Sequence, residues 1–330
     1  MENATINPSP PNLAGLIWRP ITINDLAALV ELAHTCHLID GGLFFMFEPD
    51  TLESRYFPDA PSSGIVAYTS DGRLAACAGV SINGDSGRQR ARIVGLVRPD
   101  VRRRGIGTYL MQWSQEQAKT LLAGVAEPQR VMQVATESLT EPAHRLYLAH
   151  GFACVFEELV MERDLHLLVP DRPLPQDVTI TNWQPDLAEQ FFQAYHTSFR
   201  ERPGFPGFSA AEWIAQVTEN DHKPEWSLLA CVDGEPVGFV IGNIDLTTDP
   251  PGGHIWQIGV IPAQRRRGLA SALLVETMRR MQEAGARSAL LTVHLNNPGA
   301  IKAYSQLSFT TIGRRARYER IAERLLVASK

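Results

Sequence analysis

The hydrophobic residues of this chain change their spacing in a regular order. On one face of a predicted helix they recur every three or four residues, at Ala270, Leu273, Leu274, Met278 and Met281. The next apolar stretch, 288–293, has the length and composition of a buried strand. Before the helix, the apolar run 228–231 leads to Asp233-Gly234, a dipeptide typical of β-hairpin turns. This part of the chain therefore predicts a unit in which strands and helices alternate.

The first half of the chain has the same order. The apolar run 65–68 leads to a turn at Asp71-Gly72, and the segment Val97-Arg-Pro-Asp-Val-Arg-Arg-Arg-Gly105 precedes a long amphipathic stretch. Its counterpart, Val260-Ile-Pro-Ala-Gln-Arg-Arg-Arg-Gly268, has Val, Pro, three Arg and Gly at the same positions. Two copies of one unit indicate a duplicated domain.

A proline-rich segment separates the two copies. Residues 169–177 contain Pro170, Pro173 and Pro175, which interrupt any periodic pattern. We therefore predict a first domain over 1–168, a linker over 169–177 and a second domain over 178–330. The fold class is α/β, with a mixed sheet in each domain.

The repeated glycine loop has the features of an anion site. A strand that ends in a glycine turn and then opens a helix directs unpaired backbone N–H groups, and the positive end of the helix dipole, at one point. Gly105 and Gly268 leave no side chain between this turn and an approaching phosphate. Each loop therefore predicts a site of the size and charge that suit a diphosphate.

Composition limits the other classes of function. The chain has 330 residues, of which 44% are hydrophobic, and a net charge of −5, which argues against nonspecific nucleic-acid binding. The cysteines stand singly, so neither a zinc site nor a disulfide framework is indicated, and we expect no metal. No apolar run approaches the roughly 20 residues of a membrane span. We expect a cytoplasmic protein, either a monomer or a homodimer.

The predicted element order, β-α-β-β-β-α-β-α-β, occurs twice, together with Arg-x-x-Gly-x-Gly/Ala and a later Ala-x-x-x-Tyr. In these features the chain resembles the GNAT acetyltransferase family. The resemblance covers about 15–166 and again about 176–320. It implies two tandem GNAT folds that use acetyl-CoA as co-substrate and acetylate a primary amine of a small molecule.

The resemblance also implies which residues bind and react. Acetyl-CoA would be bound in the first copy by Val97, Arg102, Arg103, Arg104, Gly105, Ile106 and Gly107, and in the second by Val260, Arg265, Arg266, Arg267, Gly268, Leu269, Ala270 and Asn297. Its diphosphate would lie on the loops 102–107 and 265–270. Three consecutive arginines on a loop cannot all face one anion. Tyr147 and Tyr304 would act as general acids that protonate the departing thiolate of CoA, whose conjugate thiol has a pKa of about 8.5.

The two copies depart from the family pattern at different places. Asn297 precedes the last helix of the second copy, where the first copy has Thr140, and either residue also suits a helix N-cap. The Gly-Phe that ends the motif is intact as Gly151-Phe152 but becomes Ser308-Phe309. Since 254–259 contains no carboxylate, the general base stays open. The candidates are His254, His294, Glu137 or a chain of water molecules.

The acceptor is expected between the opening helices and the last hairpin of a copy. There the second copy has 198–208, rich in Phe and Arg, and the first has the more apolar 41–47. Two roles are open for each segment. It lines a pocket for the acceptor, or it packs against the hydrophobic residues of its own or the other domain. The second copy is favoured as the catalytic one because it has both Asn297 and Tyr304. Catalysis by the first copy, catalysis by both, and a nonenzymatic protein that responds to CoA are the alternatives.

Overall fold

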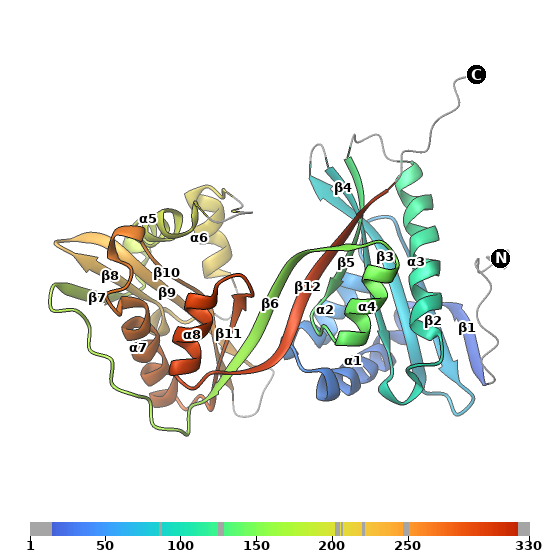
Figure 1. The fold of residues 1–330 in the computed structure, drawn as a ribbon, viewed down its shortest axis with the longest axis horizontal. Helices are drawn as coiled ribbons and strands as arrows, with labels where there is room; N and C mark the ends of the chain where they lie inside the picture. The colour runs from blue at the N-terminus through green and yellow to red at the C-terminus, as the bar shows by residue number, and fades with distance from the viewer. Residues whose placement is uncertain are drawn as a thin grey trace, which may run out of the picture. The chain divides into compact units, whose positions relative to one another are not determined.

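A computed structural model describes residues 15–85, 88–124, 129–201, 205, 207–219, 222–246 and 251–322. The chain divides into two compact units. Unit 1 comprises 1–158 together with 313–330, and unit 2 comprises 159–312. Each unit contains a mixed α/β arrangement, as the sequence predicts (Figure 1).

Unit 1 follows the predicted element order, with one further helix, α2, between the first helix and the second strand. Its elements are β1 (Leu16–Pro20), α1 (Leu26–Asp40), α2 (Pro49–Tyr56), β2 (Ser62–Thr69), β3 (Leu74–Asp85), β4 (Arg88–Val97), α3 (Ile106–Ala123), β5 (Gln129–Thr136), α4 (Glu141–Ala149) and the first part of β6 (Ala153–Asp164). Strands β1 to β4 pair antiparallel in sequence order, and β4 pairs parallel with β5.

Unit 2 repeats this order. Its elements are β7 (Val178–Asn182), α5 (Ala188–Phe199), α6 (Ala210–Thr218), β8 (Leu228–Val232), β9 (Glu235–Asp245), β10 (Gly252–Val260), α7 (Leu269–Glu283), β11 (Ser288–His294), α8 (Pro298–Gln306) and the first part of β12 (Thr310–Ile321). Strands β7 to β10 pair antiparallel, and β10 pairs parallel with β11.

The last strand of the chain completes unit 1. From Gly313 onward β12 belongs to this unit, where Ala316–Ile321 pairs antiparallel with β5. Conversely, β6 belongs to unit 2 from Leu159 onward. The predicted division into 1–168 and 178–330 follows the chain in order and does not include this exchange. A strand's own sequence specifies its two faces but not the distant strand beside which it lies.

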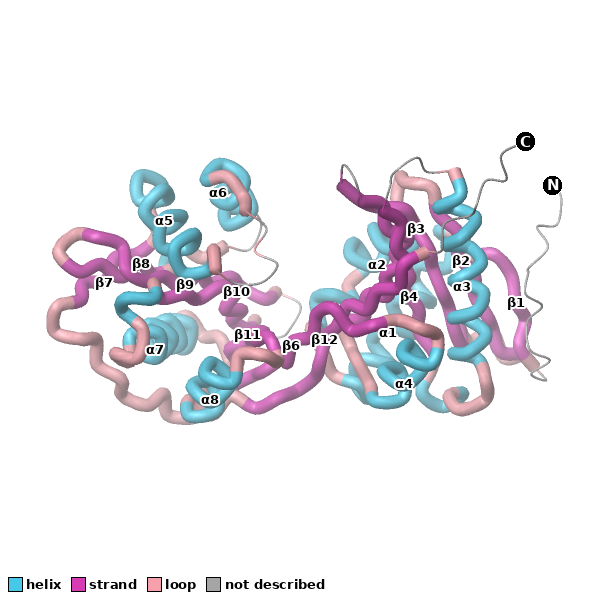
Figure 2. Tube along the Cα trace, turned by 45° about the horizontal axis from the view of Figure 1, so that its top comes forward, coloured by secondary structure: helices cyan, strands magenta, loops and turns pink. Residues whose placement is uncertain are grey.

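In each unit, helices cover both faces of the strands. In unit 1, the core on one face joins α3 and Tyr147 of α4 to the sheet, and the core on the other joins α1 and α2. In unit 2, α7 and α8 cover one face, while α5 and α6 cover the other with an aromatic core (Figure 2).

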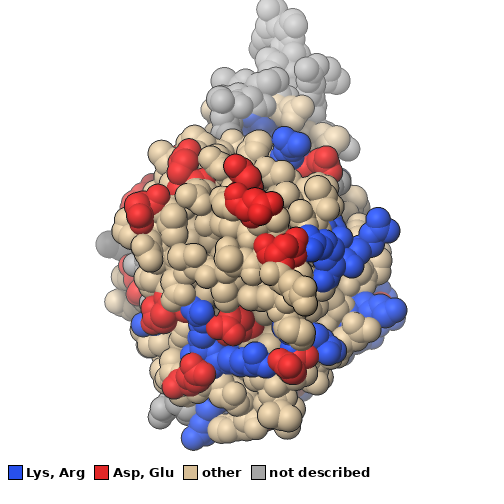
Figure 3. Space-filling model, turned by 90° about the vertical axis from the view of Figure 1, so that its left-hand side faces the viewer, with Lys and Arg blue, Asp and Glu red and all other residues tan. Residues whose placement is uncertain are grey.

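On the face of unit 2 drawn in Figure 3, basic and acidic side chains lie beside one another. Ion pairs of this unit include Arg279–Asp171 and Arg267–Asp177.

Asp25 fixes the start of α1. Its carboxylate accepts two hydrogen bonds from Arg19, at 2.8 and 2.5 Å, and one from the Tyr68 hydroxyl at 2.7 Å. The hydrogen bond with Arg19 is the main cause that holds the pKa of Asp25 well below its ordinary value. Although Asp186 opens the equivalent turn of unit 2, its side chain is exposed.

We expect Asp25→Ala to lower the free energy of unfolding by about 2 to 3 kcal/mol, the scale of hydrogen bonds to a charged group. Because folding depresses its pKa, Asp25 stabilises the protein fully above the unfolded-state pKa of about 3.9, and this contribution declines as the pH falls below that value. Urea denaturation at pH 7 and pH 3.5 measures both effects. Asp186→Ala is the matched control, and an equal loss in the two variants would contradict this role of Asp25.

Helices α4 and α8 end in equivalent turns with different residues. Gly151 has φ +79°, and Ser308 has φ +64°. An L side chain in this left-handed region costs about 1 kcal/mol relative to glycine. We therefore expect Ser308→Gly to raise the free energy of unfolding by about 1 kcal/mol. Gly151→Ser is expected to lower it, although an added Cβ meets no atom closer than 3.7 Å. Urea denaturation tests this, and a neutral or destabilising Ser308→Gly would show that the turn carries no strain.

Candidate active site

The two glycine loops have the same backbone geometry. Gly105 and Gly268 are the N-caps of α3 and α7, with φ of +84° and +81°. The N–H groups of the first three residues of each helix have no intrahelical partner, as at the start of any helix. Glycine offers no side chain to cap them. An added Cβ at either glycine would meet no atom within 4 Å. Each loop is thus an open cradle of backbone donors at the positive end of a helix dipole.

The first arginine of each triplet secures its loop to the fold. Arg102 donates from Nε to the carbonyl of Val97 at 2.9 Å, and its two Nη atoms bind the carboxylate of Asp40 at 2.7 and 2.6 Å. Arg265 donates from Nε to the carbonyl of Val260 at 3.1 Å. Its Nη2 donates to the carbonyl of Ser198 at 3.0 Å. These two arginines are therefore engaged within their units.

The remaining arginines of the triplets are exposed, as are the loops themselves. Arg103 and Arg266 have φ of +64° and +63°, a conformation that is uncommon outside glycine. Arg267 forms an ion pair of 2.6 Å with Asp177. Strained backbone at the same position of both loops is typical of functional turns.

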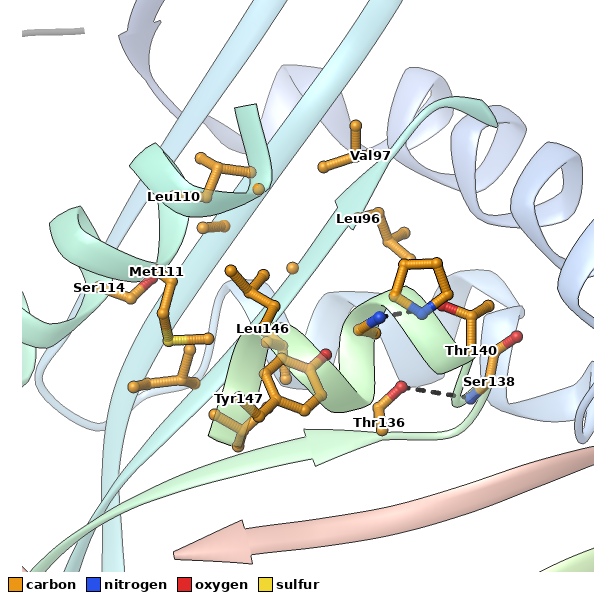
Figure 4. A pocket seen from close by; sticks show the side chains of 18 of the residues that line it. Leu96, Val97, Leu110, Met111, Ser114, Thr136, Ser138, Thr140, Leu146 and Tyr147 are labelled. Carbon is orange, nitrogen blue, oxygen red and sulfur yellow. Dashed lines mark hydrogen bonds between the residues drawn. The ribbon is translucent and has the colours of Figure 1, made fainter. Parts of the chain in front are cut away.

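The parallel strands of each unit diverge beside the loop. Pairing between β4 and β5 ends at Ile93 and Val134, and pairing between β10 and β11 ends at Ile255 and Leu291. In unit 1 the diverging ends open into a cavity of about 830 Å³. It is lined by the glycine loop, by the ends of β4 and β5, and by residues of α2, α3 and α4 (Figure 4).

Tyr147 extends from α4 into the space between the two diverging strand ends (Figure 4). Burial raises the pKa of its hydroxyl to about 12, and a hydrogen bond with Thr136 opposes this in part. The hydroxyl is therefore protonated at neutral pH. Tyr147 and the cofactor loop, which sequence analysis singles out separately, line the same cavity.

Glu137 is also a wall of this cavity, but it is surrounded by arginines. Its carboxylate lies 2.6 Å from Nη2 of Arg317, 2.9 Å from Nε of Arg315 and 3.3 Å from Nη2 of Arg55. Burial alone would raise the pKa of Glu137, yet the three guanidinium charges outweigh burial and hold it below the ordinary value. A carboxylate so engaged is a weak proton acceptor, and the general base stays unassigned.

Unit 2 presents its candidate residues in similar places. Asn297 accepts a hydrogen bond from Ala300 N at 3.2 Å, and Thr140 accepts one from Ala143 N at 3.3 Å, so both act as N-caps. The half-buried Tyr304 packs on the core of its unit beside Phe309. The pairing of β10 with β9 shifts between Ile255 and Gln257, whereas β3 and β4 pair without a shift from Ala76 to Asp85.

The other two base candidates lie on unit 2 strands. His254 is half-buried on β10, opposite Asn243 of β9 and Leu290 of β11. His294 ends β11, and its Nδ1 accepts a hydrogen bond from the backbone N–H of Asn296 at 3.1 Å.

The two candidate acceptor segments have different environments. In 41–47, Leu43 and Phe47 are buried, and Phe47 contributes both to the core of unit 1 and to the cavity wall. Of 198–208, residues 202–204 and 206 lie outside the described residues. Phe199, Phe205 and Phe208 pack on the aromatic core of unit 2, which is the packing alternative for this segment.

Sequence analysis did not find three polar residues of the cavity. Ser114 lines it, and its buried hydroxyl has no hydrogen-bond partner among the described residues. Asp40, the partner of Arg102, and Arg55 of α2 line it as well. None belongs to a motif. Ser114 lies within the predicted helix after the loop, where an apolar face of helical period can indicate burial but not an unpaired hydroxyl.

The geometry described so far defines a class of protein: a duplicated α/β fold in which each unit presents a helix N-terminus beside two diverging parallel strands. The model of the Acetyltransferase (GNAT) family matches residues 27–152 and 184–309. The chain therefore belongs to the GNAT family, and it is an acetyltransferase with a tandem arrangement of two GNAT domains.

Curated relatives match this chain over most of their length. A mycothiol acetyltransferase of Frankia alni is 26% identical over 93% of this chain and 95% of its own. One of Mycolicibacterium paratuberculosis is 30% identical over 69% of this chain and 72% of its own. In its tandem architecture the chain thus resembles mycothiol synthase.

Solved structures give the same fold. A GCN5-related N-acetyltransferase from Sphaerobacter thermophilus has a TM-score of 0.71 and 25% identity over 93% of this chain and 95% of its own. A tandem GNAT protein from the clavulanic acid biosynthesis pathway has a TM-score of 0.63 and 16% identity, covering 93% of this chain and 99% of its own. The second match supports the fold alone.

Proposed function

We propose that this protein transfers the acetyl group of acetyl-CoA directly to a primary amine of a small molecule, with a tyrosine as general acid. The observation that carries the proposal is the cavity of unit 1. It joins an open backbone cradle for a diphosphate to a protonated tyrosine between two diverging strands. Bound acetyl-CoA supplies a thioester, an acetyl group already activated for transfer.

The residues of unit 1 fit acetyl-CoA. Gly105 and Gly107 line the cavity at its cradle, where the added Cβ of Gly105 would have open space around it. The unpartnered Ser114 hydroxyl offers a further polar contact inside the cavity. The glycine loop would hold the diphosphate, together with the exposed Arg103 and Arg104, because backbone donors and guanidinium groups both favour phosphate. The equivalent loop of unit 2 has the same geometry, so we propose that it binds acetyl-CoA too.

Proton transfer is the second task of the site. An amine with a pKa near 10.4 is neutral in only about one molecule in 10³ at pH 7, so the acceptor must lose a proton before it attacks. Tyr147 would donate a proton to the leaving thiolate. Its raised pKa keeps the hydroxyl protonated over the whole physiological range.

We place the reaction in unit 1. The sequence favours unit 2 through Asn297 and Tyr304, but Asn297 and Thr140 have the same capping role, so this residue does not separate the units. Unit 2 is the second candidate because its strand β10 has the register shift between Ile255 and Gln257, and such bulges are frequent next to active sites.

The proposal extends to the acceptor and to the cellular compartment. The names of the relatives make an acceptor related to mycothiol one candidate among small amines. The free and buried Cys36 and Cys77 suit a reducing compartment such as the cytoplasm. No helix in the described part of the chain has both the length and the apolar character needed to cross a bilayer.

The test of the proposed function is a screen of the pure full-length protein. It would be incubated with acetyl-CoA and a panel of small primary amines, and free CoA thiol and acetylated amine would be measured together. Equal amounts of the two products for at least one amine are expected. Binding of acetyl-CoA with no acetylated product from any amine would favour the alternative of a nonenzymatic protein that responds to CoA.

A further inference from the structure

Unit 1 contains a partly buried arginine cluster that the proposed chemistry does not use. Arg55 of α2, Arg92 of β4 and the pair Arg315 and Arg317 of β12 surround Glu137. The side chains of Arg55 and Glu137 are 8% and 0% exposed. Both line the cavity, on walls other than the glycine loop. Arg55 and Glu137 therefore border the same space as Tyr147, and the other arginines of the cluster lie behind them.

The last strand of the chain, β12, supplies two of the four arginines of this cluster. Side chains alternate between the faces of a strand, so Ala316 and Tyr318 face one side and Arg315 and Arg317 the other. Ala316 and Tyr318 belong to the core beneath α3. The two arginines consequently face the side that α1 and α2 cover, where Arg55 also lies.

The charges of the cluster do not balance. The cluster contains one carboxylate in addition to Glu137. It is Glu158, whose Oε2 is 3.9 Å from Nη1 of Arg315. Four guanidinium groups thus face two carboxylates, an excess of two positive charges among the described residues. The side chain of Arg92 forms no hydrogen bond and no ion pair within 4.0 Å in the described part of the chain, although its charge is attracted to Glu137.

An uncompensated buried cation is unfavourable, and an anion at the same place relieves the cost. Burial lowers the pKa of Arg55 and of Arg92 below the ordinary arginine value, the direction expected for cations that are partly deprived of water. Other charges on the cavity wall do not supply the anion, since Asp40 is paired with Arg102.

We propose that the acceptor of unit 1 is a small amine that also carries an anionic group, such as a carboxylate, and that Arg55 binds this group. The inference rests on the proposed function, because it names the class of acceptor for the same cavity. Arg55 is the specificity residue. Glu137, Arg315 and Arg317 are positioning residues that hold its guanidinium and set the local excess of positive charge.

The experiment measures binding, so it does not depend on turnover. Calorimetric titrations of the full-length protein would use N-acetyl amino acids and their carboxamides, which resemble the product and differ only in the anionic group. We expect the acids to bind about 10-fold to 100-fold more tightly than the amides, the range of a hydrogen-bonded ion pair. Arg55→Met should remove this preference. Arg73→Met, at an exposed arginine paired with Asp71, should retain it.

A second variant is expected to change the affinity for acids in the opposite direction, and it tests the anion site if Arg55→Met does not fold. Glu137→Gln removes a negative charge from the cluster and is expected to tighten the binding of acids several-fold, with amides unchanged. Equal affinities of acids and amides for the wild-type protein, no binding by any acid, or an unchanged preference in both variants would each overturn the anion site. If the preference is found but no amine is acetylated, the anion site stands and the proposed function fails.

Discussion

Replacing Tyr147 with Phe is expected to lower kcat by about 100-fold or more, the contribution of a general acid. The substitution removes one oxygen from a ring that remains packed, and its expected effect is on proton transfer to the leaving thiolate. Because the pKa of Tyr147 is raised to about 12, the wild-type hydroxyl is protonated at neutral pH. The dissociation constant of acetyl-CoA should stay within about threefold of the wild-type value.

Tyr304→Phe is the matched control, since Tyr304 occupies the equivalent position in unit 2. Its turnover should remain close to that of the wild-type protein when both are measured by release of CoA thiol with the same amine. A large loss in Tyr304→Phe, with Tyr147→Phe unaffected, would move the reaction to unit 2. Similar losses in both would indicate that both units are active.

The second large effect is expected at the cradles. Gly105→Glu places a carboxylate where the glycine loop would hold a diphosphate, and like charges repel at short range. We expect calorimetry to show two acetyl-CoA sites per chain in the wild-type protein and one in Gly105→Glu. Affinity at the altered site should fall by about 100-fold or more, because charge repulsion adds to the loss of backbone contacts.

Backbone strain needs a separate control because Gly105 has positive φ. Gly72 has φ +83° and open space around an added Cβ, and it lies in the turn between β2 and β3. Gly72→Glu therefore introduces the same strain and charge away from the cavity. Gly234→Glu is the corresponding control for Gly268→Glu, because Gly234 also has positive φ and open space around an added Cβ. Two intact sites in Gly105→Glu, or a site lost in Gly72→Glu, would contradict the assignment of the cradle.

The sequence predicted the features that depend on local spacing. The repeated glycine loops and the hairpins at Gly72 and Gly234 are short motifs, and the structure confirms these elements. The two GNAT folds were recognised from the same motifs. A loop or turn of this kind is specified by a few neighbouring residues whose backbone angles glycine or a capping side chain permits.

Features that depend on distant partners were not predictable. Nothing in Thr310–Ile321 shows that this strand leaves unit 2 and pairs with β5, because any strand of suitable alternation can do so. The environment of Glu137 has the same origin. Its three arginines come from α2 and β12, far away in the sequence, so one of the base candidates proves to be the centre of an ion-pair cluster.

The central claim is that acetyl transfer takes place in the cavity of unit 1. The most direct measurement is the rate of acetylated-amine formation by Gly105→Glu and by Gly268→Glu, followed by mass spectrometry with a saturating amine. The account predicts that Gly105→Glu loses nearly all of the rate while Gly268→Glu keeps at least about half. A full rate in Gly105→Glu together with an abolished rate in Gly268→Glu would contradict it and place the reaction in unit 2.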